Sequence, residues 1–298
     1  MVVTGTANLR GKLLQNEMLS HYTSWRTGGP ADYVFIPADL DDLSTFLREL
    51  PGTAPVTLLG LGSNTLIRDG GVEGVVIITQ GALNKISHTD VQEVRAEAGV
   101  ASAQLARFTA RTGFSGLEFM AGIPGTVGGA LAMNAGCFGG EVWRFVSRVE
   151  TINRHGEIRF RSLQEFEIGY RSVIRPEGEW FVAGHFSLQA GDREKSLNDI
   201  RLLLEKRNNT QPTGTANCGS VFRNPPHNYA GRLIEECGLK GTSLGGARVS
   251  EKHANFIIND NKATSADIEN LIAKIVAIVA EKTGIRLIPE VCIIGRSV

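Results

Sequence analysis

The sequence has few cysteines, no long apolar run and no excess of charge of either sign, and each absence excludes a class of protein. The 4 cysteines form no C-x-x-C pair, so we expect neither a metal site nor a disulfide framework. Lysine plus arginine and aspartate plus glutamate both number 31, which argues against binding to nucleic acid or to a membrane surface. No stretch reaches the ~20 apolar residues of a membrane-spanning helix, and the N-terminus has no apolar run of signal-peptide length. We therefore expect a cytoplasmic globular protein. A monomer is the expected oligomeric state, which none of these absences determines.

Histidine is missing from the sequence around Ser220, where the chain reads Cys218-Gly-Ser-Val-Phe-Arg-Asn-Pro-Pro226. A nucleophilic serine normally lies beside a general base on a tight strand-to-helix turn. Here the nearest histidine, His227, follows two prolines. The segment is therefore either a turn that ends a strand or the site of a serine that supplies its proton.

Glycine is abundant at 35 residues, and most of it gathers in segments 60–81, 113–140 and 238–246, which we expect to be loops. Gly60-Leu-Gly-Ser-Asn64 follows the apolar run 56–59, so its main-chain N–H groups could close on a phosphate. The third glycine of a dinucleotide fingerprint is missing, which argues against a Rossmann site. The segment 122–136 holds several further glycines, and each costs roughly 0.5–1 kcal/mol in a helix or strand. Close approach to a large ligand, or a tightly packed bend, would justify that cost.

The apolar pattern alternates between the periods of helices and strands, which predicts an α+β fold. A composition shift near 190–192 marks a boundary before the C-terminal part. The expected helices are 39–50, 102–112 with Ser102 as its cap, 194–208, 230–237, and 264–283 with a capping box at Thr264; the expected strands are 56–60, 74–79, 93–100, a hairpin over 149–160 with its turn at His155-Gly156, 181–188 and 253–259.

Six ordered motifs resemble those of the UDP-N-acetylenolpyruvoylglucosamine reductase family. They are Thr27-Gly-Gly with Ala31-Asp32, Gly60-Leu-Gly-Ser-Asn64, Ala121-Gly-Ile-Pro-Gly-Thr-Val-Gly-Gly-Ala130 with Asn134-Ala-Gly136, Tyr170-Arg171, the Cys218–Pro225 segment and Ile288-Pro-Glu-Val291. The resemblance implies a flavin fold of the vanillyl-alcohol-oxidase type, with FAD-binding lobes over 1–80 and 81–192 and a C-terminal substrate-binding domain over 193–298. No tyrosine insertion fits between Tyr170 and Leu188, so the chain is similar to the shorter form of the family.

The resemblance also implies an activity and its cofactors. The family uses NADPH and non-covalent FAD to reduce UDP-N-acetyl-3-O-(1-carboxyvinyl)glucosamine, the enolpyruvyl ether of UDP-N-acetylglucosamine, to UDP-N-acetylmuramate for peptidoglycan. The residues that would hold FAD by this resemblance are Thr27, Gly28, Gly60, Gly62, Ser63, Asn64, Thr65, Gly122, Ile123, Pro124, Gly125, Thr126, Gly128, Gly129, Asn134 and Gly136.

Three residues would carry the chemistry by the same resemblance. Hydride transfer from flavin N5 to the enolpyruvyl group leaves an enolate, which Arg171 and Glu290 would stabilise and Ser220 would protonate. Tyr170, Arg223, Asn224 and His253 would contact the substrate. From the residues alone, Arg171 and Glu290 are also typical of charged groups at exposed strand ends, and His253 of a structural histidine.

Two other functions fit the same motifs. A flavin oxidase on this scaffold would use oxygen in place of the enolpyruvyl acceptor, and Cys137 directly after the second glycine segment leaves a covalent flavin link open. A non-catalytic flavin- or nucleotide-binding module would need only the glycines.

Overall fold

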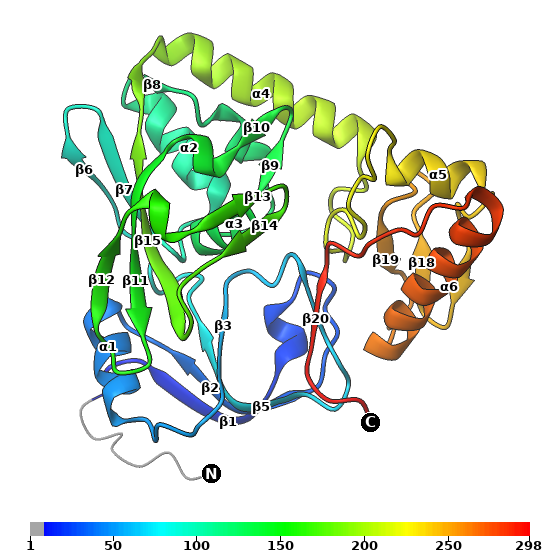
Figure 1. Cartoon of the computed structure of the whole chain (residues 1–298), viewed down its shortest axis with the longest axis horizontal. Coiled ribbons are helices and arrows are strands. Elements are labelled where there is room, and N and C mark those ends of the chain that lie inside the picture. The colour runs from blue at the N-terminus through cyan, green and yellow to red at the C-terminus, as the bar shows by residue number, and fades with distance from the viewer. Residues whose placement is uncertain (1–8) are drawn as a thin grey trace. The chain divides into compact units, whose positions relative to one another are not determined.

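The computed structural model describes residues 9–298, and Figure 1 traces their helices and strands. Residues 1–8, part of the N-terminus considered above for a signal peptide, lie outside the described residues. The chain divides into two compact units. The first holds the residues up to Gln15, Tyr33–Leu61 and Gly74–Lys206, and the second holds Asn16–Asp32, Gly62–Glu73 and Arg207–Val298. Both combine helices with strands, which confirms the α+β class.

A four-stranded sheet, most of it in the first unit, follows the order β1-β2-β5-β3. Its strands are β1 (Lys12–Met18), β2 (Pro30–Ile36), β5 (Val72–Ile78) and β3 (Val56–Leu59). Helix α1 (Leu40–Glu49) begins as predicted, because the Asp39 side chain accepts from the Asp42 N–H. Its apolar stripe, with Leu43 and Phe46, packs into a core with Phe35.

A five-stranded antiparallel sheet in the order β12-β11-β15-β7-β6 forms the rest of the first unit's framework. The strands are β12 (Ile158–Arg161), β11 (Val146–Asn153), β15 (Glu179–Ser187), β7 (Glu93–Glu97) and β6 (Ile86–Asp90). Helices α2 (Ser102–Arg111) and α3 (Val127–Met133) bury Leu105 and Leu131 in its core. The helix α4 (Arg193–Thr210) follows.

Two predictions for this unit were wrong. Ser102 does not cap α2: the N-cap is Ala101, without a side-chain bond, and Ser102 is the first helical residue. The segment 113–140 is not a continuous loop, because it contains α3. The apolar contacts of Val127, Ala130 and Leu131 in the core outweigh the low helix propensity of the adjacent glycines.

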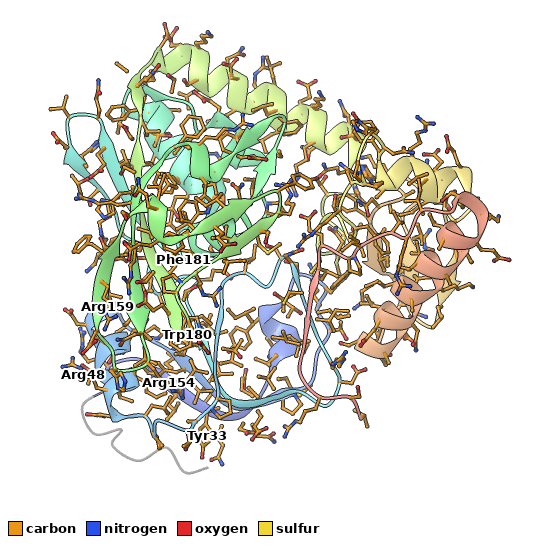
Figure 2. The ribbon with its side chains drawn as sticks, viewed as in Figure 1. Tyr33, Arg48, Arg154, Arg159, Trp180 and Phe181 are labelled. Carbon is orange, nitrogen blue, oxygen red and sulfur yellow. The ribbon has the colours of Figure 1, made fainter. Side chains whose placement is uncertain are left out.

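The hairpin of β11 and β12 turns at Gly156, with a φ of 72°, as predicted. Side-chain bonds tie this turn to α1 and to the loop after it. Ser44 Oγ donates to the Gly156 carbonyl at 2.5 Å, and the Arg154 guanidinium donates to the carbonyls of Gly52 and Ala54. Arg154 and Arg48 are labelled in this region in Figure 2.

One face of the five-stranded sheet carries a buried ionic cluster. The Glu150 carboxylate accepts from Arg95 Nε and Nη2 at 2.7 and 2.8 Å, and His185 Nε2 lies 2.8 Å from it. Glu93 interacts with His185 Nδ1 at 3.2 Å and with Arg148 at 2.9 Å. Burial alone would raise the pKa of Glu150, but the hydrogen bonds from Arg95 and His185 outweigh it and lower the pKa to about 2.

We expect Glu150 to make stability depend on acid pH. A carboxyl group with a lowered pKa in the folded state stabilises the fold above its ordinary pKa, and this contribution is lost as pH falls toward about 2. Between pH 5 and pH 3, Glu150→Gln should therefore lose less unfolding free energy than the wild type, by about 1–2 kcal/mol. Urea unfolding at both pH values measures this. The control Glu49→Gln, at the exposed end of α1, should follow the wild type, and identical pH slopes in all three proteins would contradict the prediction.

The second unit joins distant parts of the sequence. Strand β4 (Thr65–Ile67) pairs in parallel with β20 (Cys292–Ile294), and a three-stranded sheet contains β17 (Ser243–Leu244), β18 (Ala247–Val249) and β19 (Ile257–Asn259). Helices α5 (Ala230–Glu236) and α6 (Ser265–Thr283) pack against each other. The capping box at Thr264 and the left-handed Gly284 that ends α6 are confirmed. The strand predicted over 253–259 begins only at Ile257, because 253–256 form a turn.

The remaining elements are short. They are β8 (Phe114–Ser115), β9 (Gly136–Cys137), β10 (Gly140–Glu141), β13 (Glu167–Gly169), β14 (Ser172–Ile174), β16 (Gln189–Ala190) and the 3-10 turns η2 (Leu19–Tyr22), η3 (Glu118–Gly122), η4 (Val142–Arg144) and η5 (Leu163–Glu165). Within residues 9–298, no helix has both the length and the apolarity needed to cross a membrane. In the same range, no group of three or more His, Cys, Asp or Glu side chains is arranged so that it could hold a metal ion.

Candidate functional site

In the first unit, Gly60 packs closely against the side chain of Thr126. A methyl group on Gly60 would overlap Thr126 Oγ1. Thr126 is buried, and its hydroxyl has no hydrogen-bond partner among the described residues. Because a buried hydroxyl without a partner costs about 1–3 kcal/mol, a ligand oxygen at this position would satisfy it. The residues present therefore fit a phosphate- or hydroxyl-bearing group.

The segment that carries Thr126 is held rigidly. The N–H groups of Val127 and Gly128 donate to the carbonyls of Val100 and Ala98 at 2.8 and 2.9 Å. A Cβ atom at Gly128 would lie 2.8 Å from the Ala98 methyl group, so close packing excludes a side chain at this position. Gly125 has a φ of 150°, which favours glycine. The glycines of 122–136 were explained above either by close approach to a ligand or by tight packing. Tight packing accounts for Gly128.

Arg171 lies at the tip of the hairpin that β13 and β14 form. It has a φ of 53°, a left-handed conformation that costs a non-glycine residue on the order of 1 kcal/mol. Its guanidinium donates to the carbonyls of Asn134 and Gly136, and Asn134 Nδ2 donates back to the Gly169 carbonyl at 3.0 Å. The guanidinium lies 5.3 Å from the ring centre of Tyr170, which is 49% exposed. The structure thus brings Arg171 to the end of the glycine-rich segment.

Ser220 and Glu290 lie on adjoining segments of the second unit. The Glu290 N–H donates to the carbonyl of Val221, the residue after Ser220, at 2.7 Å. Both residues are half-buried. Burial raises the pKa of the neighbouring Cys218 thiol to about 12, so this group stays protonated near neutral pH.

The loop 62–65, predicted from the sequence to hold cofactor, also supports Glu290. Asn64 Nδ2 donates to the Glu290 carbonyl at 3.0 Å, and the Asn64 carbonyl accepts from the Cys292 N–H at 2.9 Å. Gly62 has a φ of 63°, and a side chain there would overlap the Tyr22 carbonyl. Thr65 begins β4 and Ser63 is half-buried. Sequence reasoning missed the support of Glu290 by Asn64, because the two residues are 226 positions apart.

The candidate substrate residues of the second unit differ in their surroundings. Asn224 is exposed, and its Oδ1 accepts from the Ala230 N–H at 3.1 Å. Arg223 has a buried Nε without a hydrogen-bond partner in the described part of the chain. The pKa of His253 is lowered, chiefly because burial disfavours the imidazolium.

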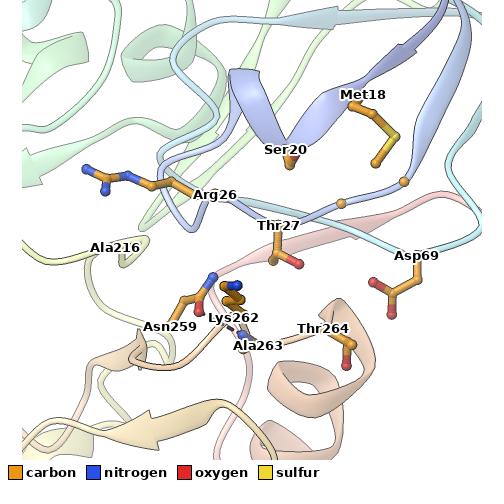
Figure 3. A pocket seen from close by; sticks show the side chains of 12 residues that line it. Met18, Ser20, Arg26, Thr27, Asp69, Ala216, Asn259, Lys262, Ala263 and Thr264 are labelled. Atoms are coloured by element: carbon orange, nitrogen blue, oxygen red, sulfur yellow. Dashed lines mark hydrogen bonds between the residues drawn. The ribbon is translucent and has the colours of Figure 1, made fainter.

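Thr27 and Gly28 line a cavity of about 520 Å³ in the second unit, shown in Figure 3. Asp69, at the same cavity, accepts from the N–H groups of Ser265 and Ala266 at 2.9 Å each, so it caps α6. Thr27 is buried, with its Oγ1 3.4 Å from Ser265 Oγ.

The other predicted FAD residues of the first unit lie beside η3 and α3. The 3-10 turn η3 ends at Gly122, and Ile123 and Pro124 follow it. In the first turn of α3, Gly129 lies near Thr126.

Known proteins with similar sequences cover nearly the whole chain. The family model for the C-terminal domain of UDP-N-acetylenolpyruvoylglucosamine reductase matches residues 211–294, and the FAD binding domain model matches 31–160. The UDP-N-acetylenolpyruvoylglucosamine reductase of Legionella pneumophila (strain Corby) is 57% identical over 96% of this chain and 93% of its own. The chain belongs to the UDP-N-acetylenolpyruvoylglucosamine reductase family. The reductase of Alkalilimnicola ehrlichii is 53% identical over 96% of both chains.

A solved structure supports the same family. The crystal structure of the reductase from Thermus caldophilus superposes with a TM-score of 0.81 at 32% identity, covering 96% of this chain and 100% of that one. The fold class expected from the motifs, an FAD-binding region followed by a C-terminal reductase domain, is thereby confirmed. As a member of this reductase family with an FAD-binding domain, the chain is a flavin-dependent oxidoreductase.

Proposed function

We propose that this protein reduces the enolpyruvyl ether of UDP-N-acetylglucosamine to UDP-N-acetylmuramate, with NADPH as reductant and FAD as cofactor. The observation that carries the proposal is identity of 57% over 96% of the chain to a protein named for this reaction. The proposal places the enzyme in the cytoplasm, as a monomer, in peptidoglycan precursor synthesis. It assigns 1–80 and 81–192 to the FAD-binding lobes and 193–298 to the substrate.

Bound FAD would supply the hydride-transfer chemistry that links NADPH to the substrate. The Thr126 hydroxyl, which has no partner among the described residues, would donate a hydrogen bond to the cofactor. Gly60, which has no side chain, would leave room beside this hydroxyl. The rest of the proposed FAD set is Thr27, Gly28, Gly62, Ser63, Asn64, Thr65, Gly122, Ile123, Pro124, Gly125, Gly128, Gly129, Asn134 and Gly136. Gly128, Asn64 and Asn134 have structural bonds or contacts of their own, so they would contribute through the shape of the main chain.

The protein's own residues would manage the charge that forms on the substrate. The Arg171 guanidinium would bind the carboxylate as a planar pair of donors, a geometry that lysine lacks. Glu290 would hydrogen-bond the enolic carboxylate. The Ser220 hydroxyl would give its proton to the carbon that carries the negative charge. Tyr170, Arg223, Asn224 and His253 would hold the nucleotide-sugar, and the buried, unpaired Arg223 Nε supports a polar ligand group near it.

An anaerobic flavin titration tests the function. The purified protein should be yellow, NADPH should bleach its flavin absorption, and the enolpyruvyl nucleotide should restore it without oxygen. Restoration by oxygen alone would favour an oxidase, and no bleaching would favour a binding module. Release of the flavin on acid precipitation would exclude a covalent link to Cys137.

Gly60→Ala should weaken FAD binding, because the added methyl group overlaps Thr126 Oγ1 within a segment that is fixed by backbone bonds. We expect FAD affinity to fall at least 10-fold, corresponding to a cost of about 1.4 kcal/mol or more. The flavin content of the purified variant and a fluorescence titration with FAD measure this. The matched control is Gly52→Ala, where an added methyl group has no atom within 4 Å, and it should bind FAD like the wild type. Normal FAD affinity in Gly60→Ala would remove the contact of Gly60 with Thr126 from the cofactor site.

A further inference from the structure

Asn255 is buried in the second unit, and each of its polar groups is bonded. Its side chain makes both hydrogen bonds of a peptide group: Nδ2 donates to the Phe222 carbonyl at 2.8 Å, and Oδ1 accepts from the Phe222 N–H at 2.9 Å. Its main-chain carbonyl accepts from the Val221 N–H at 2.9 Å. Its N–H donates to His253 Nδ1 at 3.2 Å. One residue therefore holds two residues directly after Ser220 and also orients His253.

The hydrogen bonds of Asn255 continue to the segment of Glu290, the residue proposed to hydrogen-bond the enolic carboxylate. Val221, which bonds to Asn255 through its N–H, accepts from the Glu290 N–H at 2.7 Å through its carbonyl. Phe222 pairs with Pro289 as an isolated bridge. The segment after Ser220 therefore has hydrogen bonds to Asn255 and to the Glu290 segment. A shift of this segment would move Ser220 relative to Glu290.

No apolar residue of similar size could replace these bonds. Without the amide, the N–H and carbonyl of Phe222, itself buried, would lose their partners, at about 1–3 kcal/mol for each group. The segment would relax toward other partners. His253 Nδ1 would keep its bond from the Asn255 N–H only if the turn 253–256 stayed in place. A donor at Nδ1 requires the neutral tautomer with its proton on Nε2, which is consistent with the lowered pKa of His253.

We propose that Asn255 is a positioning residue for proton delivery: it holds Val221 and Phe222 so that the Ser220 hydroxyl keeps its place relative to Glu290. This inference rests on the proposed function, because it assumes that Ser220 protonates the reduced substrate. Asn255 acts through the main chain and does not touch the reacting atoms.

Two variants and one control test the inference. Asn255→Leu removes both side-chain bonds at similar volume, and Asn255→Asp, which is nearly isosteric, replaces the Nδ2 donor by a carboxyl oxygen that faces the Phe222 carbonyl. The control Asn153→Leu removes a buried amide of the first unit that accepts from the N–H groups of His155 and Glu157 at 2.9 and 3.0 Å. For each protein, stopped-flow absorbance gives the rate of flavin reduction by NADPH, the rate of reoxidation by the enolpyruvyl nucleotide, and the solvent deuterium isotope effect on reoxidation.

We expect both Asn255 variants to reduce flavin within about 3-fold of the wild type and to reoxidise it more slowly, with a larger solvent isotope effect. The loss in Asn255→Leu should be on the order of 10²-fold, the usual result of a small misplacement of a catalytic group. Asn153→Leu should change thermal stability without changing the ratio of the two rates. If Asn255→Asp folds and keeps the wild-type rate ratio and isotope effect, the inference is wrong. If the wild type itself is not reoxidised by the nucleotide, the proposed function is wrong instead.

Discussion

Ser220→Ala is expected to separate the two halves of the catalytic cycle. Flavin reduction by NADPH should continue near the wild-type rate, because no proton from Ser220 is needed there. Reoxidation by the enolpyruvyl nucleotide should fall by roughly 10²- to 10⁴-fold, the range typical of losing a general acid. Stopped-flow absorbance of the flavin under anaerobic conditions measures both rates.

The control for this experiment is Ser243→Ala. Ser243 is an exposed serine of β17 in the same unit, and its hydroxyl donates to the nearby Gly241 carbonyl at 3.3 Å. It should match the wild type in both rates. Equal slowing of both half-reactions in Ser220→Ala would mean that Ser220 has a structural role and supplies no proton.

Arg171→Lys should reduce turnover on the order of 10²-fold while FAD content and reduction by NADPH remain close to the wild type. Arg171 has a left-handed backbone conformation at the tip of the hairpin. Its guanidinium donates to two carbonyls at once, those of Asn134 and Gly136. Lysine carries a single ammonium group and cannot present the same planar pair of donors to a carboxylate. Steady-state kinetics with the enolpyruvyl nucleotide, together with flavin quantification, measures the effect.

Arg175→Lys is the matched control. Arg175 lies four positions further along, and its Nε donates to the Glu179 carbonyl at 2.6 Å, so the same change of side chain there tests for a general effect of losing a guanidinium. Its turnover should be unchanged. A normal rate in Arg171→Lys would remove Arg171 from the site.

The sequence predicted those helices and strands whose determinants lie within the element or next to it. Helix α6 was predicted to within one residue, because its apolar stripe, capping box and terminal glycine all lie within the helix or next to it. Helix α3 was not, because its glycines favour a loop and only its contacts in the core favour a helix. The pairing of β4 with β20 could not be predicted either, since neither strand contains a signal for its partner.

The same distinction applies to the site. Ser220 and Glu290 could be proposed from the sequence only through the resemblance of their motifs to those of the family, because each residue alone is also typical of a turn or an exposed strand end. Their proximity, through the Glu290 N–H and the Val221 carbonyl, depends on contacts between segments far apart in the chain. The role of Asn255 could not be predicted from the sequence, because no motif marks a buried asparagine whose side chain bonds to the main chain of a distant residue. The conformation of Arg171 was also invisible, since arginine does not favour a positive φ.

The discontinuous make-up of the second unit constrains how the protein can mature during translation. Its early segments, Asn16–Asp32 and Gly62–Glu73, leave the ribosome long before Arg207–Val298, and β4 gains its partner only when β20 is synthesised. Until then, Trp25 and Leu66, which end in the apolar core of this unit, have no completed core to enter. Contacts between such distant segments form slowly because a long loop must close first. The nascent chain therefore carries apolar side chains that a chaperone could bind until synthesis nears its end.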